Sequence, residues 1–231
     1  MLKEISIILP LHNKGHIIEK TIDQIFNSVL FEKCEVIVVE NESTDDSLSK
    51  IKKIQKQYLT KLDIKLLKTK KGKGNAIRKA IPEIKYNLCW ITGADLPFGF
   101  TDLEGAINDE LICDVYLGSK SHKDSKINRK VSRRIYSSVF FWTRKILLKL
   151  KYKDTHGSII VKSSELQKIS NSLEQDGFFI DTEIVFQLDK LNLHIVEIPV
   201  TLINDDNLTT VKPLKDGIKM LYQTLNLSIK N

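Results

Sequence analysis

Short apolar runs alternate with segments of helical periodicity through the first half of the chain. Five runs rich in β-branched and other apolar residues are typical of strands: residues 5–11, 35–40, 63–67, 87–92 and 114–118. Between the first three runs, apolar residues recur at helical spacing, as at Ile18, Ile22 and Ile25 and again at Ile51, Ile54 and Tyr58. This alternation predicts an α/β fold, a Rossmann-like, doubly wound and mostly parallel sheet flanked by helices.

The second half is more basic. Residues 126–153 hold ten Lys or Arg among many apolar side chains, with no Pro or Gly to interrupt a helix. A strand at 158–161, a short helix, a helix at about 180–191, a strand at 193–198 and a final helix from about Leu214 complete the prediction. No linker, repeat or second core is evident, so we expect residues 1–231 to form a single domain.

Composition narrows the class of protein. The 231 residues are 42% hydrophobic, enough for a real core, and no apolar run approaches the roughly 18 residues that a membrane span needs. The first residues lead directly into a strand, so we expect no secretory signal.

Cys34, Cys89 and Cys113 lack metal or redox spacing and are expected to be buried free thiols in a reducing cytosol. The net charge of +7 favours anionic partners.

Polar loops follow three of the predicted strands. They are residues 12–15, 40–45 and 93–95. Because carboxyl ends of parallel strands share one edge of a sheet, we expect the three loops to converge on one site. Residues 68–76, a basic turn with Gly72 and Gly74, lead into a helix after the third strand, where backbone N–H groups and cations suit a phosphate.

Individual residues in these loops allow two interpretations. Ser43, Thr44 and Asp45 offer hydrogen bonds to a base and ribose, but the same residue types commonly cap a helix. Asp95 suits Mg²⁺ or Mn²⁺ bridging to a diphosphate, but an isolated aspartate is more often a turn or cap residue. The order of several ligand-type loops on one sheet favours the ligand interpretation.

Three other kinds of site are excluded by the spacing of residues. Ile77 stands where the third glycine of a dinucleotide fingerprint would be, so NAD binding is not expected. The chain has no Gly-Lys-Ser/Thr phosphate loop. The five His residues are scattered and suggest no zinc site; of these, His156 is the one of interest.

An ordered set of short motifs resembles a known family. The motifs are IILPLHN at 7–13, VIVVENESTD at 36–45, KGKGNA at 71–76, ITGADLP at 91–97, GSK at 118–120, DTHG at 154–157 and EIPV at 197–200. In order and spacing they resemble the family 2 glycosyltransferases, most of all the branch of dolichyl-phosphate mannose synthases and dolichyl-phosphate glucosyltransferases. The resemblance runs from about residue 5 to residue 200.

The resemblance implies a GT-A fold, a UDP- or GDP-linked sugar donor, a divalent cation (Mg²⁺ or Mn²⁺) and inversion at the anomeric carbon. Residues 1–120 would bind the donor and residues 121–231 the acceptor. The implied donor-binding residues are Pro10, His12, Asn13, Glu40, Asn41, Ser43, Asp45, Gly72, Gly74, Asn75, Ala94 and Asp95, with Asp95 also the metal ligand and a catalytic residue. The acceptor phosphate would be bound by Lys120, Arg129, Arg133 and Arg134, with Lys120 replacing the usual arginine of this branch.

Three departures from the family pattern concern acidic positions. The paired aspartates after the second strand are Glu40 and Asn41, the glutamate usual after Asn13 is Lys14, and the first acid of the aspartate-x-aspartate motif is Gly93. These departures leave a metal site with one carboxylate.

We expect transfer of the sugar to a polyprenyl-phosphate-type lipid, since a phosphate is already an anionic nucleophile and needs no base. Were the acceptor instead a sugar hydroxyl of a surface glycan or glycolipid, Asp181 or Glu183 would be the base. The altered acids leave a third interpretation, a non-catalytic nucleotide-sugar-binding protein. No nucleic-acid partner is expected.

The basic segment at 126–153 has two interpretations of its own. Arg129, Arg133, Arg134, Arg144 and Lys145, beside Phe140, Phe141 and Trp142, suit a helix pair lying on an anionic membrane. Alternatively, its apolar residues pack against the sheet and its cations are solvated. The first interpretation predicts a cytoplasmic protein, peripheral at the inner face of the membrane.

Overall fold

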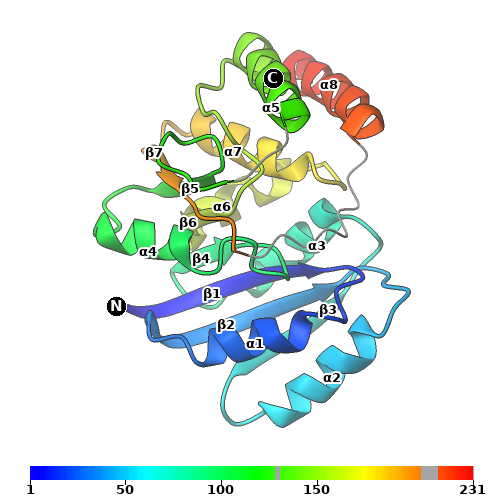
Figure 1. The fold of residues 1–231 in the computed structure, drawn as a ribbon, viewed down its shortest axis with the longest axis vertical. Helices are drawn as coiled ribbons and strands as arrows, with labels where there is room; N and C mark the ends of the chain where they lie inside the picture. The colour runs from blue at the N-terminus through cyan, green and yellow to red at the C-terminus, as the bar shows by residue number, and fades with distance from the viewer. Residues whose placement is uncertain (128–130, 204–212, 231) are drawn as a thin grey trace.

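Seven strands form one sheet at the centre of the molecule. The computed structural model describes residues 1–127, 131–203 and 213–230, with the side chains of 131–136 and 213–218 left aside. The strands are β1 (Leu2–Leu11), β2 (Phe31–Glu40), β3 (Asp63–Lys68), β4 (Leu88–Ile91), β5 (Val115–Ser119), β6 (Ile159–Lys162) and β7 (Ile195–Pro199). Their order is β3-β2-β1-β4-β6-β5-β7, and β6 alone among them runs antiparallel to its neighbours (Figure 1). The predicted mostly parallel sheet is confirmed.

Helices cover both faces of this sheet. Along β1, Ile5, Ile7 and Leu9 face one core and Ile8 faces the other, because successive side chains of a strand point to opposite faces. The first core is closed by α1 (Ile18–Phe26), α2 (Ser47–Gln57) and α4 (Thr101–Asn108). The second is closed by α3 (Lys73–Ala80), α6 (Ser163–Ile169), α7 (Ile180–Lys190) and parts of α5 (Val131–Leu148) and α8 (Pro213–Lys230). Two short 3-10 turns, Ile81–Glu83 and Ser170–Ser172, complete the list.

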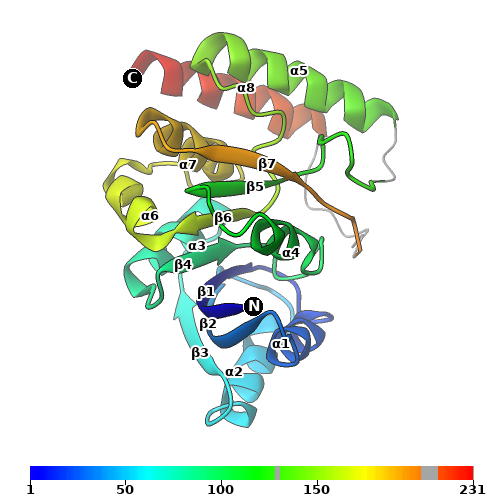
Figure 2. The same ribbon diagram turned by 90° about the vertical axis from the view of Figure 1, so that its left-hand side faces the viewer.

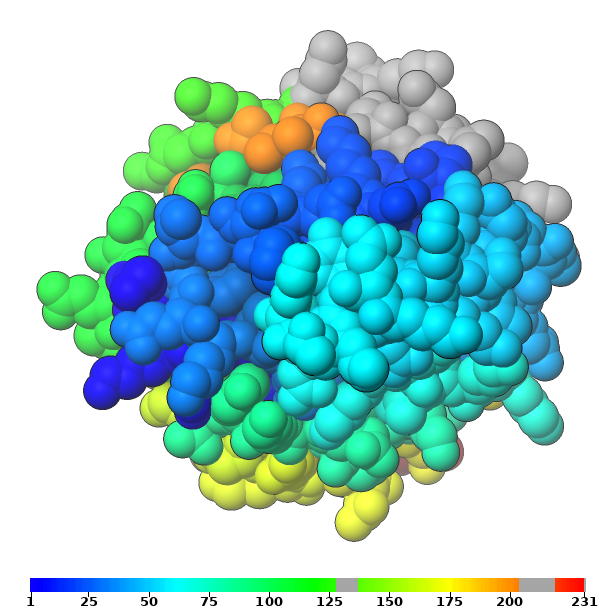
Figure 3. Space-filling view, turned by 90° about the horizontal axis from the view of Figure 1, so that it is seen from below, coloured from blue at the N-terminus to red at the C-terminus, as the bar shows by residue number. Residues whose placement is uncertain are grey.

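The helices α5 and α8 lie side by side as an outer layer over α7 and the β7 end of the sheet (Figures 1 and 2). Ser228 Oγ on α8 donates a hydrogen bond of 2.8 Å to the Leu147 carbonyl on α5. The opposite end of the molecule is covered mainly by the first third of the chain (Figure 3). The two ends of the sheet therefore differ. The β3 end is covered by helices of the first third of the chain, and the β7 end lies beneath the layer formed by α5 and α8.

Three predicted elements need correction. Strand β2 begins four residues early, at Phe31, because the run Glu32, Lys33, Cys34 is too polar to signal a strand yet pairs with β1. Helix α4 was not predicted, since it buries only Leu103 and Ala106 among its apolar residues. The basic segment contains one described helix rather than a pair; α5 ends where Lys149 adopts φ 58°, and its partner is α8.

Candidate functional site

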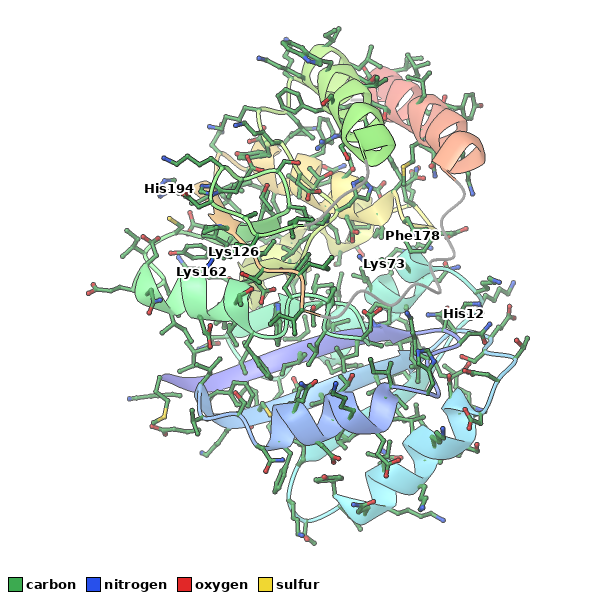
Figure 4. The ribbon with its side chains drawn as sticks, viewed as in Figure 1. His12, Lys73, Lys126, Lys162, Phe178 and His194 are labelled. Atoms are coloured by element: carbon green, nitrogen blue, oxygen red, sulfur yellow. The ribbon has the colours of Figure 1, made fainter. Side chains whose placement is uncertain are left out.

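The loops after β1, β2, β3 and β4 lie at one edge of the sheet, because these four strands are mutually parallel. Figure 4 shows His12, which follows β1, and Lys73, which begins α3, at this carboxyl edge. Lys162 and His194 lie toward the opposite edge. The predicted convergence of the ligand-type loops is confirmed.

Hydrogen bonds join the first two loops into one unit. The Asn13 N–H donates to Ser43 Oγ at 3.1 Å, and the Thr44 N–H donates to Asn13 Oδ1 at 2.8 Å. His12 Nδ1 lies 2.9 Å from the Asn41 carbonyl oxygen. The Asp45 carboxylate accepts the Gly15 N–H at 2.9 Å. Ser43 and Asp45, predicted to contact a donor, therefore use their side chains to hold the loops together.

Two further predicted donor residues lie where these strands end. Pro10 pairs with Val39 in the register between β1 and β2. Glu40, the last residue of β2, is 6% exposed, and its carboxylate accepts the Ser43 N–H at 2.5 Å. Their place at the edge agrees with the prediction, while the Glu40 carboxylate is engaged within its own loop.

Asp95 stands at the end of β4, next to the first loop. Its Oδ2 atom accepts a hydrogen bond from Lys14 Nζ at 2.8 Å. The turn around it is anchored by the fully buried Leu96, whose N–H donates to the Gly93 carbonyl at 2.9 Å, and by Thr21 Oγ1, which donates to the Ala94 carbonyl at 2.8 Å. The carboxylate is thus held in a fixed place between the ends of β1 and β4.

Each of these three loops contains one non-glycine residue in the left-handed region. The φ angles are 51° at Asn13, 58° at Glu42 and 42° at Leu96. Such conformations cost of the order of 1–3 kcal/mol each and cluster at ligand sites. The same conformation also occurs outside these loops, at Glu110, Leu111, Lys149 and Asn192, so it does not by itself mark this edge as a site.

The glycines of the turn into α3 serve a different contact from the predicted one. A Cβ at Gly72, where φ is 138°, would lie 2.2 Å from the Asp176 carbonyl oxygen, and one at Gly74 would lie 1.9 Å from that of Gln175. The N–H groups of Gly74 and Asn75 both donate to the Asp176 carbonyl, at 2.8 and 3.2 Å. These glycines let the start of α3 approach residues 175–176, so a direct role toward the donor stays a prediction.

Replacing Gly74 by Ala is expected to destabilise the protein by about 1–3 kcal/mol, because the added methyl group forces α3 away from the 175–176 backbone. The change would be measured as the free energy of unfolding in urea. Gly177→Ala is the matched control, since a Cβ there meets nothing within 4 Å, and we expect it to change stability by less than about 0.5 kcal/mol. Equal stability of the two variants would contradict the close contact.

Charged side chains gather beside these loops. Lys120, just after β5, lies 3.0 Å from Asp154 Oδ2 through its Nζ atom, which also donates to the His156 carbonyl at 2.5 Å. Lys73 Nζ lies 2.6 Å from Asp181 Oδ2 on α7. Thr155 Oγ1 and Thr182 Oγ1, which neighbour these acids in sequence, are 2.8 Å apart and join the two ion pairs. Two lysines and two acids from four elements therefore meet in one place.

Arg144 belongs to the same group and was placed wrongly from the sequence. It is 2% exposed rather than on an outward face, and it donates to Thr155 Oγ1 at 2.9 Å and to the Lys153 carbonyl at 3.1 Å. Its guanidinium lies 4.8 Å from the centre of the Phe140 ring. Phe140, Arg144 and Leu148 are four residues apart, so helical spacing could have placed Arg144 on the inward face. We call Lys73, Lys120, Arg144, Asp154, His156 and Asp181 the charge cluster.

Glu197, from the EIPV motif, positions one side of the charge cluster and was not predicted. Its carboxylate accepts Ser119 Oγ at 2.6 Å and the N–H groups of Lys153 and Asp154, each at 2.9 Å. It thereby ties the loop after α5 to the end of β5. The EIPV motif could have marked Glu197 as a residue of interest, but the sequence does not indicate which groups its carboxylate contacts.

Of the two predicted bases, only Asp181 is placed at this site. The Glu183 carboxylate accepts the N–H groups of Glu174, at 3.1 Å, and Gln175, at 2.9 Å, so its role is structural. Residues two apart on a helix point to different sides, which is why both could not face the site. Arg129 lies outside the described residues, as do the side chains of Arg133 and Arg134.

Burial sets the protonation states within the charge cluster. Burial lowers the pKa of His156 to about 3 and that of Arg144 to about 10, so at neutral pH the imidazole is neutral and the guanidinium charged. Burial raises the pKa of Asp181, against the opposing effect of Lys73. With the acids ionised, the cations Lys73, Lys120 and Arg144 face the carboxylates of Asp154, Asp181 and the neighbouring Glu197, so the formal charges balance.

Three buried polar atoms in this cluster have no hydrogen-bond partner within the part of the chain that the structure describes. They are Arg144 Nε, His156 Nε2 and Asp181 Oδ1. Because buried polar groups in folded proteins nearly always have a partner, such atoms are expected to meet a ligand or water. The cluster is thus suited to a small polar ligand that accepts a hydrogen bond from Arg144 Nε and donates one to Asp181 Oδ1.

Residues 6–163 match the sequence model of the family described as Glycosyl transferase family 2. A dolichyl-phosphate beta-glucosyltransferase from Dictyostelium discoideum is 24% identical over 206 residues, which cover 85% of this chain and 63% of that protein. The chain therefore spans less than two thirds of the length of this relative.

Solved structures that share the fold include two glycosyltransferases with bound nucleotide and Mn²⁺. The glucosyl-3-phosphoglycerate synthase of Mycobacterium tuberculosis, in complex with Mn²⁺, UDP and phosphoglyceric acid, superposes with a TM-score of 0.66 at 17% identity, covering 98% of this chain and 77% of that one. The mannosyltransferase PcManGT of Pyrobaculum calidifontis, in complex with GDP-Man and Mn²⁺, gives 0.65 at 18% identity, covering 100% and 65%. Both have the GT-A fold.

Proposed function

The chain belongs to glycosyl transferase family 2 and is a glycosyltransferase with the GT-A fold, and we propose that it transfers a sugar, with inversion, from a nucleotide-sugar donor to the phosphate of a polyprenyl-phosphate-type lipid. The observation that carries the choice of acceptor is the charge cluster beside the donor loops. The dolichyl-phosphate glucosyltransferase relative supports the same acceptor class.

The loops after β1, β2 and β4 are proposed to bind the donor. Support comes from their convergence at one sheet edge and from UDP and GDP-Man in the similar structures. His12, Asn13, Glu40 and Asn41 would meet the base and ribose, and Asp95 would lie nearest the diphosphate. The acceptor phosphate would then enter between Lys120 and Lys73, whose ammonium groups would contact it in exchange for part of their ion pairs with Asp154 and Asp181.

The predicted divalent cation is supported by the Mn²⁺ of the similar structures. In this chain, however, Asp95 is engaged by Lys14 at 2.8 Å. Among residues 1–127, 131–203 and 213–230, no group of three or more His, Cys, Asp or Glu side chains could hold a metal ion. The arrangement therefore does not fit a metal site well, and we assign no step to a metal.

The transfer would be a single displacement. An acceptor phosphate oxygen attacks the anomeric carbon from the face opposite the diphosphate, the bond from that carbon to the diphosphate oxygen breaks, and the nucleoside diphosphate leaves with the electron pair. Lys120 and Lys73 would orient the acceptor phosphate and reduce its repulsion from the donor diphosphate, an electrostatic contribution of the kind that dominates many enzymes. No proton has to be removed from the acceptor.

A second acceptor class is favoured by one observation. Asp181 Oδ1 is buried, without a partner among the described residues, and burial raises the pKa of this carboxyl group. A carboxylate with these properties suits a general base for a sugar hydroxyl. Lys73 bound to its other oxygen favours the phosphate acceptor, because the ion pair reduces the basicity of Asp181.

The decisive experiment is a transfer assay with UDP- and GDP-sugars, a short polyprenyl phosphate and a free saccharide, each with and without Mn²⁺. Sugar on the lipid phosphate alone supports the proposal. Sugar on the saccharide alone selects the hydroxyl acceptor. Donor binding without any transfer selects a non-catalytic nucleotide-sugar-binding protein.

The outer layer of α5 and α8 is proposed to contact the membrane that holds the lipid acceptor. Its exposed apolar side chains, here called the α5–α8 surface, are Val139, Trp142, Ile146, Leu221, Tyr222, Leu225 and Ile229. On α5 they are spaced by three and four residues, so they share a face. Lys145, whose Nζ lies 4.9 Å from the Trp142 ring centre, adds positive charge suited to anionic lipids.

Position supports this assignment as well. Arg144 on α5 belongs to the charge cluster, and Gln223 Nε2 on α8 donates to Gln175 Oε1 at 2.5 Å. Helix α5 therefore carries a residue of the proposed acceptor site on its inward side and part of the α5–α8 surface on its outward side. No helix in the described ranges is long and apolar enough to cross a membrane.

Flotation with vesicles tests the α5–α8 surface. The wild type is expected to float with vesicles that contain anionic lipid, and the double variant Trp142→Ala/Ile146→Ala to partition at least tenfold less, since each large apolar side chain buried contributes roughly 1.5–3 kcal/mol. Val29→Ala/Leu59→Ala, which removes two exposed apolar side chains away from this layer, is the control and should float like the wild type. Flotation of both variants alike would contradict the assignment.

A further inference from the structure

An ion pair joins the ends of β1 and β4 where the counter-cation of a donor diphosphate is expected. Lys14 Nζ and Asp95 Oδ2 are 2.8 Å apart, although the residues are 81 positions apart in sequence. Their side chains are 20% and 18% exposed, so the pair is largely shielded yet open to the loop edge. An ammonium group therefore already stands beside the acid that was predicted to hold a metal.

The fold fixes the backbone of Lys14. Its N–H donates to Ser47 Oγ at 2.9 Å, and its carbonyl accepts the N–H groups of Ile17 and Ile18, each at 3.0 Å. The preceding residue, Asn13, holds the left-handed conformation noted above. The backbone of Lys14 is thus held by hydrogen bonds, and this position directs its side chain toward Asp95.

Other acids at this edge are engaged in holding the loops. Glu40 accepts the Ser43 N–H, the Asp45 carboxylate accepts Gly15 and Ser47, and Glu42 accepts the Lys71 N–H at 3.2 Å. At Gly93, where the family has its first acid, a Cβ would lie 2.6 Å from Asp95 Oδ1. Among the residues that the structure describes, a divalent cation at Asp95 would have one carboxylate and would compete with an ammonium for it.

We propose that the Lys14 ammonium, oriented by Asp95, is the counter-cation of the donor diphosphate, and that this chain binds its donor without a divalent metal. The inference rests on the proposed function and specifies how its donor site works. At neutral pH a lysine side chain carries one positive charge and three donor hydrogens. As the bond to the anomeric carbon breaks, the electron pair moves to the diphosphate oxygen, and Lys14 would offset this charge while remaining protonated.

Calorimetric titration with UDP and GDP, in EDTA and in Mn²⁺, tests the inference without relying on turnover. Wild-type affinity for the preferred nucleotide is expected to differ less than threefold between the two conditions. Lys14→Ala is expected to bind at least tenfold more weakly in EDTA and to recover in Mn²⁺, because Asp95 is then available to the metal. Lys14→Arg retains a cation and should bind in EDTA.

Two controls make the result specific. Lys168→Ala removes an exposed lysine paired with Glu165 on α6 and should leave binding unchanged. Electron paramagnetic resonance of added Mn²⁺ should show a protein–nucleotide-bound ion in Lys14→Ala and little in the wild type. Wild-type binding that is lost in EDTA and restored by Mn²⁺ would overturn the role of Lys14 while leaving the proposed function intact. Failure to bind either nucleotide under any condition would instead overturn the donor site and this inference with it.

Discussion

Replacing Asp95 by Ala is expected to reduce sugar transfer by at least about 10²-fold, the effect typical of losing one electrostatic group that acts on a transition state. The variant removes the carboxylate that orients Lys14 beside the proposed diphosphate site. The fold should survive, because the turn is anchored by the buried Leu96 and by the Thr21 hydrogen bond to Ala94. Initial rates and circular dichroism measure the two properties separately.

Asp114→Ala is the matched control for this variant. Asp114 also forms a lysine ion pair, with Lys162 at 2.7 Å, but it lies at the opposite edge of the sheet, where Figure 4 shows Lys162. We expect its transfer rate to equal that of the wild type. Unchanged transfer in Asp95→Ala, or an equal loss in both variants, would remove Asp95 from the donor site.

Replacing Lys120 by Ala is expected to reduce transfer by about 10²-fold or more, with the larger part in a raised KM for the lipid phosphate. Lys120 is the cation of the charge cluster that also lies near the segment following Asp95, since its Nζ is 5.5 Å from the Phe98 ring centre. Lys120→Arg keeps the charge and should retain a substantial part of the activity. Lys162→Ala, a paired lysine at the far edge, serves as the control.

The same substitution also gives a pH-dependent effect on stability. Asp154 is buried, and despite that burial the Lys120 ammonium lowers its pKa below the ordinary 3.8. A depressed folded-state pKa stabilises the protein above the unfolded value and loses this effect as the pH falls through the folded value. Lys120→Ala leaves the buried carboxylate without its lysine, at a cost of roughly 3–5 kcal/mol.

The gap in unfolding free energy between wild type and Lys120→Ala should therefore be largest near neutral pH. It should narrow as the pH falls below about 4, the ordinary range of an aspartate, and toward the depressed folded-state pKa at which Asp154 of the folded wild type becomes protonated. Urea denaturation across this range measures it. A gap independent of pH would show that Lys120 does not act through Asp154.

Much of the site could be located from the sequence because its loops are local features. Each polar loop directly follows an apolar run, and parallel strands bring such loops to one edge whatever their separation in sequence. Ser43 and Asp45 show the limit of this reasoning. Their residue types suit both a ligand and a loop contact, and the observed hydrogen bonds to Asn13 and Gly15 come from a neighbouring loop that local sequence does not specify.

The departures from the family pattern acquire a joint explanation in three dimensions. Lys14 in place of a glutamate and Gly93 in place of an aspartate are separate changes in the sequence. In the fold, Lys14 pairs with Asp95, and Gly93 leaves room for the Asp95 carboxylate. Lys14 replaces a negative charge with a positive one, and Gly93 removes a second negative charge. Both changes lie beside Asp95 at the same edge of the sheet.

Apolar periodicity and the polar residues at strand ends are local features, so the strands, most helices and the edge at which the loops gather could be predicted from neighbouring residues. Which side chains contact one another became apparent in three dimensions alone. Lys73 and Asp181 are 108 residues apart, and Arg144 turns inward to Thr155 instead of toward solvent. The physical reason is that such pairs depend on strand register and on the packing of helices over the sheet, which no local pattern encodes.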